Sequence, residues 1–168
     1  PPYRINGWPS ALGLTTGREG KRAMRFWDSS AILPLLVRES TTQILLELKK
    51  TDEEMVVWWG TETECLSALA RREREGGLDR ASVSLAEESL GKILSRSHEV
   101  QPSVEVRRIA RRLLMTHPLR AADSLQLASA LVFSGNQVSE LPFVTLDKNL
   151  ASSAGKEGFS LISFAVKN

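Results

Sequence analysis

The sequence has little cysteine and histidine and no long apolar run, and each absence excludes a class of protein. A single cysteine, Cys65, rules out an internal disulfide, as is typical of a reducing compartment. His98 and His117 stand in no spacing that binds zinc, so we interpret them as ordinary surface or interface histidines. No stretch is apolar over the length that a membrane-spanning helix needs. We therefore expect a soluble, cytoplasmic protein without a membrane partner.

Residues 1–23 differ in character from the rest of the chain. They mix proline and glycine with isolated apolar side chains and show no period of 2 or 3.6. We interpret them as a leader or an added segment outside the fold, although packing on a neighbour stays an alternative. They are no secretory signal, because they lack an unbroken apolar core.

The basic pI of the chain belongs largely to this first segment. It holds four of the 22 basic and one of the 20 acidic residues, which leaves 18 basic and 19 acidic residues in positions 24–168. The remaining length suits one compact domain with a real core. Its charge balance gives no overall electrostatic footprint for nucleic acid, so such a function needs local clusters or a metal.

Residues 24–168 alternate between short apolar runs and amphipathic stretches, which indicates an α/β domain. The run at residues 55–59 is continuously apolar, as in a strand that is covered on both faces. The predicted strands are residues 24–27, 55–59, 141–146 and 159–164. The predicted helices are residues 29–37, 40–49, 61–74, 79–95, 103–116, 121–132 and 148–154.

Four acidic residues follow a predicted strand or lie in the first turn of a predicted helix. They are Asp28, Glu64, Asp123 and Asp147. In a parallel sheet such positions share one edge, where the ligands of open α/β sheets bind. Three have simpler explanations when taken singly: Asp28 as a helix cap, Glu64 as the partner of Thr61 in a capping box, and Asp123 as a charge at a helix N-terminus.

Bringing four carboxylates together is costly. Each pair at about 4 Å repels by about 1 kcal/mol in water and by about 4 kcal/mol at an effective dielectric constant near 20. A cation would offset this repulsion, and all-oxygen ligands suit Mg²⁺ or Mn²⁺. The four positions therefore predict a divalent metal site.

Four stretches of the chain match, in order, those of one known family. They are Asp28-Ser29-Ser30-Ala31, Glu64 with residues 66–72, residues 119–128, and residues 143–150. On these motifs the chain resembles the PIN-domain ribonucleases of the VapC toxin type. Asn149 departs from the pattern, since some members of the family have a further acidic residue there.

The resemblance implies a three-layer α/β/α PIN-like domain with a short parallel sheet and helices on both faces. It also implies a metal-dependent endoribonuclease, a small VapB-like antitoxin whose tail blocks the acidic groove, and a homodimer. The family's catalytic and metal-binding quartet carries over onto Asp28, Glu64, Asp123 and Asp147, with Thr145 and Ser30 as supporting hydroxyls. Chemically, the three aspartates suit the metal shell, and Glu64 is alternatively the residue that orients the attacking water.

Basic residues near the four carboxylates are candidate phosphate contacts. They are Arg71, Arg72, Arg120 and Lys148, each of which is also explained as a solvated or structural side chain. A second basic set, Arg107, Arg108, Arg111 and Arg112, lies on one predicted helix. We interpret that set first as a solvent face and second as a nucleic-acid surface.

Two other functions stay open from the sequence. An Asp-based phosphoacceptor or phosphatase-like domain would also place Asp28 or Asp147 at a strand end, but it does not explain Glu64 and Asp123 together. A catalytically inactive protein-interaction module is the other alternative, and the presence of all four acidic residues argues against it.

Overall fold

The computed structural model describes residues 24–52, 54–135 and 137–162. The interpretation of residues 1–23 and the end of the last predicted strand lie outside these residues. In chain order the elements are β1 (Met24–Trp27), α1 (Ser29–Leu36), α2 (Thr42–Lys50), β2 (Glu54–Trp58), α3 (Thr61–Arg74), α4 (Arg80–Leu94), β3 (His98–Val100), α5 (Val104–Thr116), α6 (Ala121–Ser134), the 3-10 turn η1 (Val138–Glu140), β4 (Phe143–Val144) and α7 (Lys148–Lys156).

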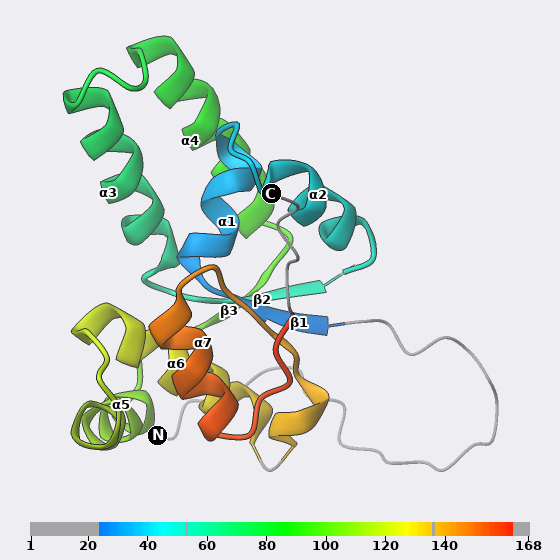
Figure 1. Cartoon of the computed structure of the whole chain (residues 1–168), viewed down its shortest axis with the longest axis vertical. Coiled ribbons are helices and arrows are strands. Elements are labelled where there is room, and N and C mark those ends of the chain that lie inside the picture. The colour runs from blue at the N-terminus through cyan, green and yellow to red at the C-terminus, as the bar shows by residue number, and fades with distance from the viewer. Residues whose placement is uncertain (1–23, 53, 136, 163–168) are drawn as a thin grey trace, which may run out of the picture.

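The four described strands form one parallel sheet in the order β3-β2-β1-β4. Helices α1 to α4 cover one face of this sheet, and α5 to α7 cover the other (Figure 1). The α/β fold class and the helix layers on both faces are thereby confirmed.

The two central strands end in apolar residues because both of their faces are buried there. Successive side chains of a strand point to opposite faces. Phe26 and Val56 accordingly belong to the core beneath α5 and α6, whereas Trp27 and Val57 belong to the core beneath α1 and α4. Because both faces are buried, the register of β1 against β2 is fixed. The position along the sheet at which each strand ends is therefore fixed as well.

Three strand predictions need correction. The structure adds a strand, β3, where the sequence analysis predicted only an interval between helices; it is short, and His98 and Glu99 are exposed, so it has little apolar signal. The strand predicted at residues 141–146 is paired only at Phe143–Val144. Of the strand predicted at residues 159–164, the described part contributes a single bridge, from Leu161 to Phe143.

A further correction concerns the end of β2, which stops at Trp58 and not at residue 59. Trp58 is buried, but Trp59 is 51% exposed.

Within the part of the chain that the structure describes, no helix has the length and apolar character needed to cross a membrane.

Candidate active site at the carboxyl edge of the sheet

Asp28 is the first residue after β1 and lies in the middle of the carboxyl edge. Its amide donates to the Val144 carbonyl at 3.1 Å, which ties the end of β1 to β4. Its side chain caps α1: the Ser30 amide donates to Oδ2 at 3.2 Å, and the Ser30 hydroxyl donates to Oδ1 at 2.7 Å. The capping role is therefore real, and it holds the carboxyl group in one orientation at the end of the strand.

Asp28 is buried, with only 3% of the residue exposed. Burial raises its pKa from 3.8 to about 6, and the nearby charge of Glu64 adds to this rise, while the hydrogen bonds from Ser30 and Thr145 oppose it. A cap at the surface needs no such burial. Perturbed carboxyl groups cluster at functional sites, so Asp28 is a candidate functional residue as well as a helix cap.

Two hydroxyl groups connect Asp28 to Asp147. The Ser30 and Thr145 oxygens lie 3.3 Å apart, and Ser30 Oγ also accepts the Leu146 amide at 2.9 Å. Thr145 Oγ1 accepts the Asp147 amide at 3.0 Å. Asp147 in turn caps α7, because its Oδ1 accepts the Leu150 amide at 2.8 Å. Both carboxylates thus sit on one hydrogen-bonded framework that crosses from β1 to β4.

Glu64 belongs to the first turn of α3 and is held by two side chains from other helices. The Ser29 hydroxyl donates to Oε2 at 2.7 Å, and the Gln126 amide donates to the same oxygen at 3.1 Å. The capping-box alternative is wrong: the N-cap of α3 is Gly60, and the buried Thr61 hydroxyl accepts from Gln126 at 3.2 Å. Glu64 is therefore directed across the edge of the sheet and not back onto its own helix.

Ser29 and Gln126 are site residues to which the sequence analysis gave no role. Gln126 is 1% exposed in a helix whose neighbouring positions are small or apolar. A buried polar side chain requires hydrogen-bond partners. A glutamine within a small and apolar stretch of helix was therefore the signal in the sequence that could have indicated a role for Gln126. The partners themselves lie 62 and 65 positions away, so the sequence could not identify them.

Asp123 lies in the first turn of α6, where its Oδ2 accepts the Arg120 amide at 3.3 Å. Burial raises the pKa of Asp123, the Arg120 amide opposes this, and the charge of Asp147 raises the pKa further. The four carboxylates thus form two electrostatically coupled pairs, Asp28 with Glu64 and Asp123 with Asp147.

No lysine, arginine or histidine of the described segments forms an ion pair with any of these four carboxylates. Three of them keep an oxygen that accepts no hydrogen bond from a described residue: Glu64 Oε1, Asp123 Oδ1 and Asp147 Oδ2. The donor set, all oxygen and negatively charged, suits Mg²⁺ or Mn²⁺.

Among residues 24–52, 54–135 and 137–162, no three histidine, cysteine or acidic side chains already stand in a metal-binding arrangement. Ligation by three of them requires side-chain rotation.

The candidate phosphate contacts lie in different places. Arg120 is the exposed N-cap of α6, and Lys148 is the exposed first residue of α7, so each adjoins a site aspartate. Arg71 is exposed near the far end of α3, whereas Arg72 is ion-paired with Glu39 in the segment between α1 and α2.

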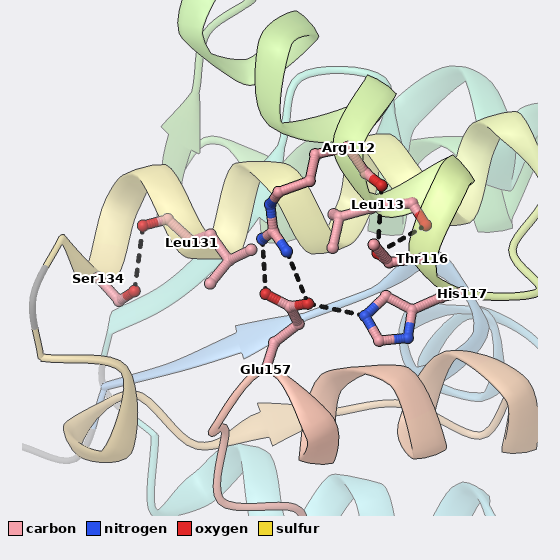
Figure 2. Close-up of polar contacts among 7 residues, drawn as sticks. All are labelled: Arg112, Leu113, Thr116, His117, Leu131, Ser134 and Glu157. Carbon is pink, nitrogen blue, oxygen red and sulfur yellow. Dashed lines mark hydrogen bonds and ion pairs between the residues drawn. The ribbon is translucent and has the colours of Figure 1, made fainter.

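The basic set on α5 is partly engaged in structural contacts. Arg112 donates to both oxygens of Glu157, at 3.0 and 2.6 Å, and His117 contacts the same carboxylate at 2.7 Å, which ties the end of α5 to the end of α7 (Figure 2). Arg108 pairs with Glu105 on its own helix. The exposed Arg107 and Arg111 have no described partner.

No protein-family model and no curated protein matches the sequence. Solved structures that share the fold include the following three. A toxin-antitoxin complex from Klebsiella pneumoniae is 16% identical with a TM-score of 0.55, and the match covers 83% of this chain and 96% of that one. FitAcB from Neisseria gonorrhoeae is 16% identical with a TM-score of 0.58 and the same coverage. PAE2754 from Pyrobaculum aerophilum is 22% identical with a TM-score of 0.54, covering 86% of this chain and 87% of that one. The chain therefore has the three-layer α/β/α PIN-like fold expected from its sequence.

Proposed function

We propose that the chain is a metal-dependent endoribonuclease, a PIN-domain toxin of the VapC type that a VapB-like antitoxin restrains. The observation that carries the proposal is the charge at the carboxyl edge: four carboxylates from separate segments lie there, and none of them forms an ion pair with a described residue. A folded protein retains such a cluster at a cost in stability, which a bound cation would offset.

The donor chemistry assigns the metal shell to Asp28, Asp123 and Asp147, directly or through water. A bound Mg²⁺ or Mn²⁺ would lower the pKa of a water molecule and neutralise negative charge on the leaving oxygen of a phosphodiester. The Ser30 hydroxyl holds the Asp28 carboxylate, and the Thr145 hydroxyl holds the backbone amide of Asp147.

Glu64 suits a different role, that of orienting the attacking water. Both of its described donors, Ser29 and Gln126, bind Oε2, so Oε1 is left to accept a hydrogen bond from water.

The two expected partners follow from the same site. Single-stranded RNA would bind along the carboxyl edge, with Arg120 and Lys148 as candidate phosphate contacts beside the aspartates. An antitoxin tail would cover the acidic groove and compete with RNA. One of the structures that shares the fold is a toxin-antitoxin complex, which supports this proposal. A homodimer belongs to the proposal as well.

The test is cleavage of a mixed RNA pool by the purified full chain with Mg²⁺ or Mn²⁺, beside a reaction in EDTA. Asp28→Asn should abolish cleavage. Asp79→Asn is the matched control, because Asp79 also caps a helix, α4, but lies outside the site. No cleavage by partner-free protein under either metal, or undiminished cleavage by Asp28→Asn, would reject the nuclease. The phosphoacceptor and the inactive interaction module would then be tested next.

A further inference from the structure

Trp59 is a large aromatic side chain whose exposure the fold does not explain. It is 51% exposed, and it is the one exposed aromatic among the large apolar side chains of the described residues. Its neighbours along the chain beyond Gly60 are the buried Thr61 and the exposed polar residues Glu62 and Thr63. A protein-docking surface is normally a contiguous apolar patch, and the segment from β2 into α3 has no second exposed apolar side chain.

The position of Trp59 is set by the sheet. Phe26 of β1 lies level with Val56 of β2, so the parallel register puts Asp28 level with Trp58. Asp28 directly follows β1 and Trp59 directly follows the adjacent β2, so Trp59 lies about one residue further along the sheet than Asp28, on the neighbouring segment. Its amide donates to the Val100 carbonyl at 3.0 Å, which anchors its backbone to the end of β3.

The indole ring of Trp59 also packs against the neighbouring side chain of Trp58. Trp58 packs edge to face with Trp59, with ring centroids 6.2 Å apart and an angle of 71° between the planes. A Cβ atom on Gly60 would lie 2.4 Å from Trp58 Nε1, so this glycine leaves room for the Trp58 ring. A buried tryptophan thus braces an exposed one at the edge of the candidate active site.

We propose that Trp59 is a stacking platform for one nucleobase of the single-stranded RNA substrate, beside the phosphate that the carboxylates address. This inference rests on the proposed nuclease function and specifies how the substrate is bound. Indole rings stack on bases of any sequence, so Trp59 contributes affinity and register without reading a particular base. A braced ring loses little freedom on binding, which suits this role.

The test uses the full chain with Asp28→Asn, so that RNA is bound and not cut, with and without Trp59→Ala. The probes are a 12-nucleotide single-stranded RNA and a series in which each base in turn is replaced by an abasic site. Trp59→Ala should weaken binding of the intact RNA by about 5- to 150-fold, and Trp59→Phe should restore most of the loss. The loss should vanish for one abasic position, because the stacked base is then absent. The slope of affinity against salt should not change.

Leu85→Ala is the control, since Leu85 is a 65% exposed apolar residue on α4. Equal affinity of the Trp59→Ala and Trp59-intact proteins would overturn the inference, as would a loss of equal size on every abasic RNA. A change in the protein's mass in solution on Trp59→Ala would identify a protein interface instead. If the unmodified chain cuts RNA and only the Trp59 prediction fails, the nuclease proposal stands; if no RNA is bound or cut, both fail.

Discussion

Replacing Asp28 with asparagine should stabilise the metal-free protein at neutral pH while it abolishes activity. In the folded chain burial raises the pKa of Asp28 from 3.8 to about 6. Each pKa unit corresponds to 1.36 kcal/mol, so an ionised Asp28 costs the fold about 3 kcal/mol above pH 6. Asparagine removes this charge and remains a good helix cap. Allowing about 1 kcal/mol for an altered hydrogen bond to Ser30, we expect a gain of about 2 kcal/mol.

The sign of this effect depends on pH. Below pH 3.8 the carboxyl group is protonated in both the folded and the unfolded chain, so it imposes no cost, and the cost grows as the pH rises from 3.8 to about 6. The free energy of unfolding, measured with urea in EDTA, should therefore rise by about 2 kcal/mol at pH 7.5 and should not rise at pH 4, where the charge term is smaller than the hydrogen-bond term. Asp52, whose pKa burial likewise raises to about 6, is unchanged in the variant and cancels from the difference.

Asp79→Asn is the matched control for this measurement. Asp79 also caps a helix, but it is exposed, and its hydrogen bonds with Ser82 lower the pKa of its carboxyl group. Its replacement should not stabilise the protein at pH 7.5. If Asp28→Asn lowered stability by the same amount at both pH values, the reasoning would be refuted, because Asp28 would then serve the fold through its hydrogen bonds alone.

Three further predictions concern the surroundings of the site. Asp123→Asn should abolish RNA cleavage and leave the metal-free protein as stable or more stable in thermal unfolding; a large destabilisation would assign Asp123 to the fold. Gln126→Glu should place a second carboxylate against Glu64 and lower the free energy of unfolding by between about 1 and 4 kcal/mol at pH 8, with recovery on acidification; a loss that is independent of pH would contradict the contact. Joint replacement of Arg107 and Arg108 with alanine should leave RNA affinity unchanged across salt concentrations, as for a solvent face, whereas a smaller salt slope would establish a nucleic-acid surface.

The positions of the aspartates could be predicted because a strand that is buried on both faces has a continuous apolar signal with a definite end. Asp28 directly follows β1 and Asp147 lies three residues beyond the end of β4, and each also caps the helix that follows. Capping and site formation are therefore not competing explanations. The strand positions its carboxylate at the edge of the sheet, and the cap fixes the orientation of that carboxylate.

The surroundings of Glu64 could not be predicted in the same way. Its partners Ser29 and Gln126 come from helices on opposite faces of the sheet, and only the packed layers bring them together. The local pattern of Thr61 and Glu64 favoured a capping box, and tertiary hydrogen bonds replaced it. The short strand β3 was missed for a related reason, since a three-residue edge strand with exposed side chains has no apolar period.

The central claim is that the four carboxylates constitute one divalent-cation site. Calorimetric titration of the partner-free chain with Mn²⁺ at pH 7.5 tests it most directly. We expect saturable binding that weakens at pH 5, where the pKa of Asp28, raised by burial to about 6, favours its protonated form. Binding should be lost in Asp123→Asn and retained in Asp79→Asn. Absence of binding, or equal binding by both variants, would contradict the account.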